Sequence, residues 1–175
     1  MHLARVRVSM RRMKHTILVA ALIAALAGTA RAGGQAGSIG VGAEFQLSGV
    51  GGLSANYDEG RFHAGGFLSF ADPPGVNNTV FDIGGRFYWH LASTASSDFS
   101  IGGSLGIQSV YQNPGNNVSP RLTNLFLEPG FQIRAFVAPN VALSFTGGFS
   151  IGTVDASGVQ ITGDAVATAG VHYYF

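Results

Sequence analysis

The sequence predicts an all-β protein: an eight-stranded antiparallel up-and-down transmembrane β-barrel, preceded by a cleaved signal peptide. Three observations support this prediction. Apolar residues alternate with small or polar ones at a period of two, clusters of Gly, Pro, Asn and Asp separate the alternating segments, and a basic and then apolar leader precedes them. The composition, with 26 glycines and only 11% charged residues, suits membrane barrels or low-complexity chains, and a disordered chain would not alternate.

Residues 1–32 have the form of a secretory signal peptide. Five basic residues precede an apolar run from Ile17 to Ala27, and Ala30-Arg31-Ala32 fits small-x-small cleavage after Ala32. This run is well short of the roughly 20 apolar residues that a membrane-spanning helix needs. We therefore expect a leader that is removed during export.

Two details of the leader leave alternatives open. Arg11-Arg12 would also suit a twin-arginine export signal, which implies a folded passenger, whereas barrel assembly requires an unfolded chain. Translation starting at Met13 instead of Met1 would remove the arginine pair.

Cleavage would reverse the charge of the chain. Six of the ten basic residues lie in the leader, and all nine acidic residues follow it. The mature chain then has four basic residues against nine acidic ones, a net charge of −5, and nucleic-acid binding loses its support. Because the sequence contains no Cys, it offers neither a disulfide framework nor a lipoprotein attachment site.

After a short lead-in at residues 33–37, residues 38–175 form one predicted barrel domain. The alternation is clearest from Ile39 to Ser48, where Ile, Val, Ala, Phe and Leu alternate with Gly, Gly, Glu, Gln and Ser. The predicted strands cover residues 38–48, 53–58, 62–71, 79–91, 98–111, 121–137, 141–153 and 161–175. The second is the weakest prediction, because it falls short of the roughly 9 to 11 residues of a spanning strand.

The segments between the predicted strands contain the residues that tight reversals require. In chain order they are residues 49–52, 59–61, 72–78, 92–97, 112–120, 138–140 and 154–160. Pro129 does not fit this scheme, since it falls in the middle of the sixth strand, and it predicts a bulge there or a later start of the strand.

Pairs of glycines recur in the middle of four predicted strands, at residues 65–66, 84–85, 102–103 and 147–148. Gly weakens an isolated strand, so we expect these pairs to provide curvature or room for large neighbours. A phosphate-binding loop is a poor alternative, because no pair opens a helix and no Gly-Lys-Ser/Thr follows.

Parity assigns the side chains to two faces. The outward face carries Phe45, Tyr57, Phe62, Leu68, Phe70, Phe81, Phe87, Trp89, Phe99, Leu105, Tyr111, Leu125, Leu127, Phe131, Phe145, Phe149, Tyr173 and Phe175. Nine charged residues and histidines share the parity of Gly and Ser, which places them in the lumen: Glu44, Asp58, His63, Asp82, Arg86, Glu128, Arg134, Asp164 and His172. A soluble barrel would have the opposite arrangement, with apolar side chains inside.

An eight-stranded barrel is just wide enough for side chains to fill its lumen, where charges must pair or stay hydrated. We predict a polar network in the lumen formed by Glu44, Asp82, Arg86, Glu128, Gln132 and Arg134. Its hypothetical pairs join the two arginines to Glu44 and Glu128. Such a network is either structural, plugging the barrel, or part of a gated ion path.

The C-terminal segment from Ala165 to Phe175 alternates and finishes on an aromatic residue. With Val171, Tyr173 and Phe175 on its outward face, it resembles the C-terminal signature of Gram-negative outer-membrane β-barrels, and the general build is similar to the OmpA transmembrane domain and the OmpX-like superfamily. This resemblance implies that the three residues are read by the barrel-assembly machinery. It also implies that both termini are periplasmic and that the connections after strands one, three, five and seven face outward.

The expected function is that of an integral outer-membrane protein with a mainly structural or surface-interaction role. The alternatives are a narrow channel for small solutes, gated by Glu/Arg pairs, and a lipid-modifying enzyme. We expect no enzyme, cofactor or metal site, because His63, His90 and His172 lack a suitable Ser or carboxylate partner by our count, and no ligand pair recurs at i, i+2 on one strand. The expected partners are outer-membrane lipid and, during biogenesis, periplasmic chaperones and the assembly machinery, with the mature barrel a monomer.

Overall fold

The computed structural model describes residues 35–46, 50–154, 159–160 and 165–175, which contain ten strands and no helix. No helix within these residues is long and apolar enough to cross a membrane. The predicted signal peptide, its cleavage site and Asp164 lie outside the described residues.

The strands are β1 (Ser38–Gln46), β2 (Gly51–Asp58), β3 (Phe62–Ala71), β4 (Val80–Ser93), β5 (Ser97–Tyr111), β6 (Arg121–Ala138), β7 (Val141–Phe149), β8 (Ile151–Val154), β9 (Val159–Gln160) and β10 (Ala165–Tyr174). The predicted strands correspond to β1 to β6, to β7 with β8, and to β10. β2 is longer than predicted, because Gly51 and Gly52 pair with Phe45 and Glu44 instead of belonging to the turn. β9 lies within the predicted connection and pairs with β8.

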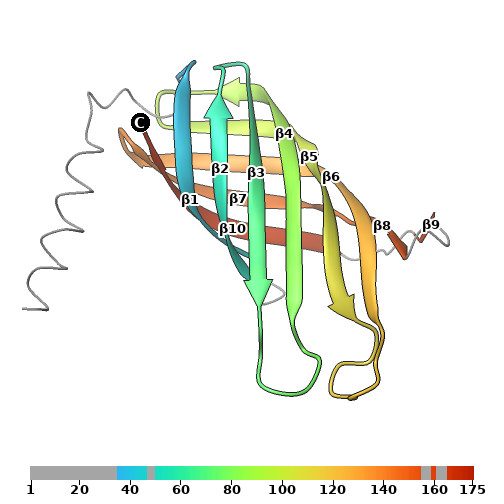
Figure 1. Ribbon diagram of the computed structural model, residues 1–175. Coiled ribbons are helices and arrows are strands. Elements are labelled where there is room, and N and C mark those ends of the chain that lie inside the picture. Colours follow the sequence, from blue (N-terminus) through green and yellow to red (C-terminus); the bar gives the residue numbers. More distant parts are fainter. Residues whose placement is uncertain (1–34, 47–49, 155–158, 161–164) are drawn as a thin grey trace, which may run out of the picture.

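The strands close into an antiparallel barrel (Figure 1). Neighbouring strands from β1 to β7 pair in chain order, and β10 closes the ring by pairing with both β7 and β1. Eight strands therefore form the wall, namely β1 to β7 and β10, as the sequence predicts. At the seam, the backbone N–H and C=O groups of Ile39 and Phe175 exchange hydrogen bonds of 3.0 Å.

The polarity of the two faces of the wall is the reverse of that in a soluble protein. Every strand of the ring exposes large apolar side chains on the outside, such as Phe45, Leu53, Phe70, Trp89 and Leu105. The largest fully buried side chains are instead mostly polar or aromatic: Arg134, Tyr88, Tyr174, His63, His172, Gln132, Asp58 and Asp82. An apolar exterior around a polar interior is the arrangement of transmembrane barrels.

Pro129 lies within β6 without ending the strand. β5 pairs with β6 through Pro129 in unbroken register. On the other side, β6 pairs with β7 up to Gly130 and with β8 from Leu127, again in one register. Because proline has no N–H to donate, the ladder is interrupted there and the partner strand is divided at Ser150. The predicted bulge or late strand start is therefore wrong.

The two glycines of a mid-strand pair have different surroundings. A Cβ atom on the inward Gly84 would lie 2.5 Å from the Phe67 ring and 2.9 Å from the Cα atom of Gly106. The outward Gly85 has ordinary space, with Gly65 O at 3.6 Å as the nearest atom. The inward glycine thus makes room for a large neighbour.

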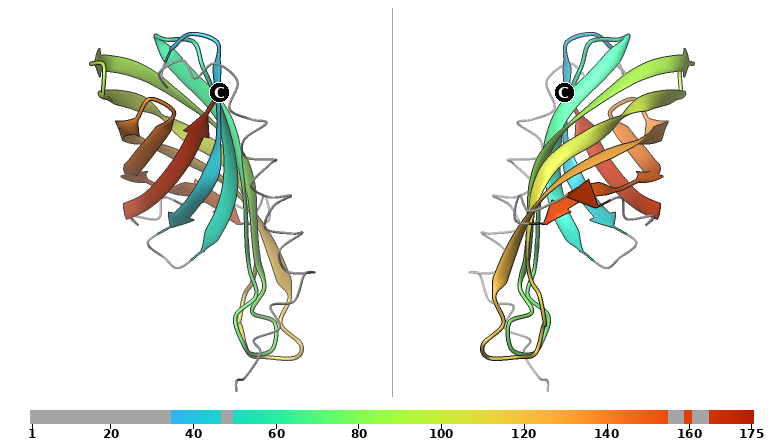
Figure 2. Two further views of the ribbon diagram at one scale, coloured as in Figure 1. Left: turned by 90° about the vertical axis from the view of Figure 1, so that its left-hand side faces the viewer. Right: turned by 90° about the vertical axis from the view of Figure 1, so that its right-hand side faces the viewer.

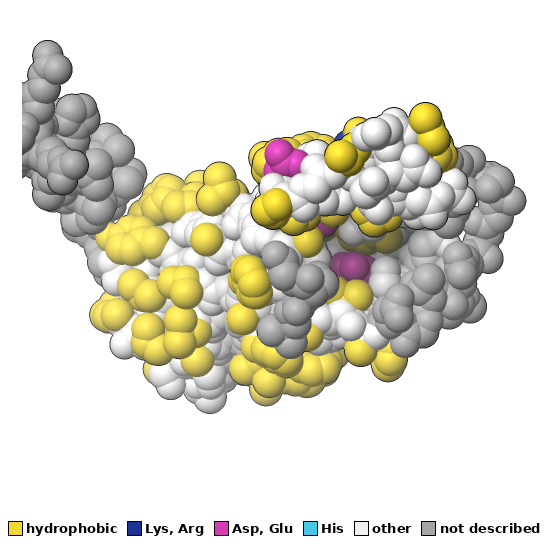
Figure 3. All heavy atoms as spheres, turned by 90° about the horizontal axis from the view of Figure 1, so that it is seen from below, with side chains coloured by type: hydrophobic (Ala, Val, Ile, Leu, Met, Phe, Trp, Pro, Cys, Tyr) yellow, Lys and Arg dark blue, Asp and Glu magenta, His cyan; other side chains and the backbone are white. Residues whose placement is uncertain are grey.

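The ends of the barrel differ. At the termini end, where β1 begins and β10 ends, tight turns join β2 to β3, β4 to β5 and β6 to β7. At the opposite, loop end, the β3–β4 and β5–β6 hairpins project beyond the wall (Figures 1 and 2). Their loops meet at the tip, where Gly115 N donates to Val76 O at 2.5 Å. Viewed from the loop end, the surface is hollowed and acidic side chains lie in the hollow (Figure 3).

Candidate functional site

The termini end of the lumen contains a buried ion cluster around Arg134 of β6. Its Nη2 atom lies 2.7 Å from a carboxylate oxygen of Asp58 on β2 and 2.7 Å from one of Asp98 on β5, and its Nη1 donates to the Tyr174 hydroxyl at 2.9 Å. The Arg134 side chain has 0% exposure. Because β2 and β6 are four positions apart in the ring of eight strands, the Arg134–Asp58 pair spans the lumen.

The strand register explains part of this cluster. Asp98 is the residue paired with Arg134 across the β5–β6 ladder, so both side chains point inward at the same level. Arg134 Nε donates to both Asp98 carboxylate oxygens at 3.0 Å. Charge-assisted contacts of this kind are stronger than neutral hydrogen bonds. Asp98 therefore holds Arg134 along the wall, and Asp58 holds it across the lumen.

Two histidines belong to the same cluster. His63 Nδ1 and His90 Nε2 lie 2.8 Å apart, and His90 Nε2 lies 3.1 Å from Arg134 Nη2. His63 is fully buried and His90 half-buried. The cluster thus joins five strand termini or near-termini, from β2, β3, β4, β5 and β6, with Tyr174 of β10 beside them.

Farther from the termini, a second ion pair joins β4 to β1. Arg86 binds Glu44 through two parallel hydrogen bonds, from Nη1 to Oε1 at 2.5 Å and from Nη2 to Oε2 at 2.6 Å. His172 Nε2 approaches the same carboxylate at 3.3 Å, and Ser54 Oγ lies 2.6 Å from that nitrogen. Bidentate geometry of this kind is specific to arginine.

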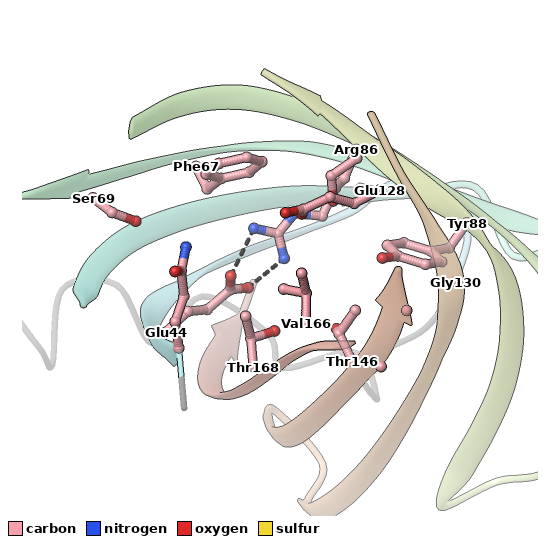
Figure 4. Close-up of a pocket in the computed structure, with 14 residues that line it drawn as sticks. Glu44, Phe67, Ser69, Arg86, Tyr88, Glu128, Gly130, Thr146, Val166 and Thr168 are labelled. Carbon is pink, nitrogen blue, oxygen red and sulfur yellow. Dashed lines mark hydrogen bonds and ion pairs between the residues drawn. The ribbon is translucent and has the colours of Figure 1, made fainter. Parts of the chain in front are cut away.

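A cavity lies beside the Arg86–Glu44 pair (Figure 4). Phe67, Tyr88, Glu128 and Thr146 are among the side chains that line it, and the Arg86 guanidinium sits 5.0 Å from the centre of the Phe67 ring. The volume open to the centres of water-sized molecules is about 30 Å³. Since one water needs roughly 10–15 Å³ by this measure, the cavity has room for about two waters.

The structure pairs the two arginines differently from the sequence hypothesis. Arg86 binds Glu44 as proposed, but Arg134 binds Asp58 and Asp98 instead of Glu44 or Glu128. The proposed single network is therefore wrong in this respect. The physical reason is the position of each residue along the barrel axis. Arg134 lies near the termini end, at the level of Asp58 and Asp98, whereas Glu44 and Glu128 lie farther from that end.

The remaining residues of the predicted network also point into the lumen. Glu128 lines the cavity, and Gln132 Nε2 donates to Thr146 Oγ1 at 2.9 Å. Asp82 is buried nearer the loop end, beside Gln108 and Gln46. Among the described residues, none of the three bonds directly to Arg86 or Arg134, although Glu128 lies close enough to Arg86 to feel its charge and Gln132 contacts His63 of the Arg134 cluster.

Sequence reasoning left Asp98 and Tyr174 out of the lumen set, and it left Asp58 out of the network. Parity alone could have found Asp98, which alternates in phase with Ser100 and the other inward residues of β5. Tyr174 also has inward parity in β10, and it ends in a polar hydroxyl that needs a partner when buried.

The three residues of the predicted assembly signal lie on the outer face of β10. Val171 and Phe175 are exposed, and Tyr173 is half-buried. They are therefore available to lipid or to a binding partner, and their role in assembly stays a prediction.

Ser54, His172 and Glu44 do not form a hydrolytic triad in spite of their proximity. In a triad, the base contacts the nucleophile through one ring nitrogen and the carboxylate through the other. Here Ser54 and Glu44 both approach His172 Nε2. All three side chains also face the interior of the barrel.

A closed eight-stranded barrel with an apolar outer face and a charged lumen is the fold of outer-membrane β-barrel proteins. Among solved structures, the chain is similar to the N-terminal β-barrel domain of OprF from Pseudomonas aeruginosa, with a TM-score of 0.61 and 13% identity over 80% of this chain and 98% of that domain. Ail, the attachment invasion locus protein of Yersinia pestis, also matches, with a TM-score of 0.45 and 12% identity over 81% of this chain and 100% of that one.

The similarity to the OprF domain confirms the predicted fold class. No protein-family model matches the chain, and no curated protein matches it significantly.

Proposed function

We propose that the protein is an integral barrel of the Gram-negative outer membrane whose lumen is sealed, so that its role is structural or lies in surface interactions. The exposed apolar side chains around the wall support the membrane location, because water would disfavour such a continuous apolar surface. In this proposal both termini face the periplasm, and the projecting hairpins face the outside of the cell.

One observation carries the proposal of a sealed lumen: the ion pair between Arg134 and Asp58. It joins opposite strands of the ring, and both side chains are fully buried, at 0% exposure. A continuous aqueous path would leave these charges hydrated and accessible. Separating the pair inside the lumen would leave buried charges unpaired, and an unpaired buried charge is strongly unfavourable, so the pair opposes opening at this level.

The middle of the lumen, farther from the termini end than the Arg134 cluster, supports the same proposal. The Arg86–Glu44 pair crosses three strand positions, and the cavity beside it holds about two waters. The loop end is hollowed (Figure 3), and the Arg86–Glu44 pair lies in the lumen between that end and the Arg134 cluster at the termini end. The alternative of a narrow channel would require both pairs to open.

The projecting hairpins support a surface-interaction role. Their tip carries Val118, which is 84% exposed. The β3–β4 and β5–β6 loops are joined by a backbone hydrogen bond from Gly115 N to Val76 O and by a bond from the Asn77 side chain to Asn116 O. An apolar side chain on a braced tip is suited to contact another surface.

A solute-release assay tests the sealed lumen. Vesicles containing the refolded full chain should retain small sugars and ions as well as empty vesicles do. Arg134→Ala should release them if it still folds, whereas Arg121→Ala, which changes an exposed arginine at the loop end, should not. Release by the wild-type chain would overturn the proposal, and a heat-modifiable gel shift would show that each barrel had formed.

Cysteine labelling tests the orientation, because the chain contains no Cys. In intact cells, a membrane-impermeant thiol reagent should label Val118→Cys at the tip of the projecting hairpins. It should not label Ser96→Cys in the β4–β5 turn at the termini end. The opposite labelling pattern would reverse the proposed orientation.

A further inference from the structure

The turn between β2 and β3 brings together three residues with metal-ligating side chains. Asp58 ends β2, His63 is the second residue of β3 and is paired with Asp58, and His90 comes from the adjoining part of β4. One ligand atom from each of these residues lies within 4.8 Å of the others, and the two imidazoles are 2.8 Å apart. The three ligands come from three different strands, so the absence of ligand pairs at i and i+2 on one strand does not exclude a metal site here.

The turn also orients two of these ligands. His90 Nδ1 donates to the Gly60 carbonyl at 2.9 Å, so Nε2 carries the lone pair of the ring and faces both His63 Nδ1 at 2.8 Å and Arg134 Nη2 at 3.1 Å. Gly60 N in turn donates to Asp58 Oδ1 at 3.0 Å, with Gly60 at a φ of 83° that favours glycine. Metal-binding histidines almost always donate their second ring N–H to a carbonyl or carboxylate in this way.

The charge balance of the cluster favours an added cation. Asp58 and Asp98 bring two negative charges, and Arg134 brings one positive charge. Asp98 already satisfies Arg134 through bonds from Nε and Nη2, and the Tyr174 hydroxyl accepts from Nη1. Asp58 therefore carries the surplus negative charge. Arg134 Nη2 lies 2.7 Å from Asp58 and 3.1 Å from His90 Nε2, so a cation bound by these residues displaces Nη2, while Nε keeps its two bonds to Asp98.

We propose that Asp58, His63 and His90 bind one divalent transition-metal ion of the Zn²⁺ type at the termini end of the barrel. Two imidazoles and one carboxylate suit Zn²⁺ and its neighbours in the series, and they do not suit Mg²⁺ or Ca²⁺, which prefer oxygen ligands. His90 is half-buried and offers the way in from the termini end. This inference does not rest on the sealed lumen, but a bound ion would take Asp58 away from the Arg134–Asp58 pair on which the proposed seal depends.

Calorimetric titration with Zn²⁺ tests the proposal on the full chain refolded in detergent micelles. The chain used should carry His2→Ala and His15→Ala, so that these two histidines, which lie outside the described residues, cannot add Zn²⁺ binding of their own. We expect one saturable Zn²⁺ site per chain and no comparable binding of Mg²⁺. Asp58→Asn, His63→Gln and His90→Gln should each weaken Zn²⁺ binding at least tenfold, because each removes a ligand.

His172→Gln is the matched control, since it changes a buried lumen histidine outside the proposed site and should leave the affinity unchanged. Asp58→Asn also separates this site from adventitious binding to an exposed histidine, which would not involve a buried carboxylate. If a variant fails the heat-modifiable gel shift, the absorption of Co²⁺ bound to the folded parent chain gives a second reading of nitrogen ligation. The proposal is overturned if the folded chain shows no saturable Zn²⁺ binding, or if the His90→Gln and Asp58→Asn variants bind it as tightly as the parent.

Discussion

The two halves of the lumen are filled in different ways. At the termini end, Arg134 is enclosed by two carboxylates, a tyrosine and a histidine, with no exposure. In the middle of the barrel, Arg86 has one carboxylate partner, with 5% and 11% exposure of the two side chains, and a small cavity lies beside the pair. The same period-two pattern thus produces a fully buried, tightly bonded plug at one level and a slightly exposed pair beside a small cavity at the next.

The largest expected effect is the loss of stability when either lumen arginine is removed, and it tests whether the two levels differ. Arg134→Met should lower the free energy of unfolding by about 3–5 kcal/mol, because it leaves two buried carboxylates without their counter-charge. Arg86→Met should cost less, about 1.5–3 kcal/mol, because Glu44 keeps His172 within 3.3 Å and faces the cavity. Urea unfolding of the refolded variants in lipid vesicles measures both. Equal losses, or a larger loss for Arg86→Met, would remove the distinction between the two levels.

The next largest effect is the loss of stability when an arginine is placed on the outer face of the wall, compared with one at the projecting tip. Leu105 lies midway along β5 on the outer face, and Leu105→Arg should cost about 2–4 kcal/mol if that face contacts lipid hydrocarbon. Val118→Arg at the tip should leave the stability unchanged, because Val118 is exposed beyond the wall. The same vesicle unfolding assay compares them. A soluble barrel would tolerate both substitutions.

The smallest effect concerns two adjacent glycines of β4. Gly84→Ala should destabilise the barrel by about 1–3 kcal/mol, because the new methyl group would press on the Phe67 ring and the β5 backbone beside it. Gly85→Ala points outward into ordinary space and should change the stability by about 0.5 kcal/mol or less. If both variants behave alike, the inward glycines do not serve to seat large lumen side chains.

The outline of the fold could be predicted from the sequence because period-two alternation reports directly which face a side chain occupies. It placed Arg86 and Glu44 in the lumen, where they meet. It could not predict that Arg134 meets Asp58, since that pairing depends on the relative heights of β2 and β6, on opposite sides of the ring. Parity carries no information on height.

The register between β5 and β6 explains two other features that the sequence did not predict, the Asp98–Arg134 pairing and the continuity of β6 at Pro129. The 112–120 connection is long enough to leave the β5–β6 register open, so the Asp98–Arg134 pairing was not evident from the sequence. Pro129 predicts a missing hydrogen bond, but whether the strand ends there depends on its neighbours, and β5 holds β6 in register through it.

Single-channel recording in planar bilayers tests the central claim most directly, namely that the cross-lumen pair of Arg134 and Asp58 seals the barrel. The wild-type chain should give no discrete current steps, and Arg134→Ala or Asp58→Ala barrels that pass the heat-modifiable gel shift should give them. Steps from the wild-type chain, unchanged by either substitution, would contradict a seal at this level and favour a channel.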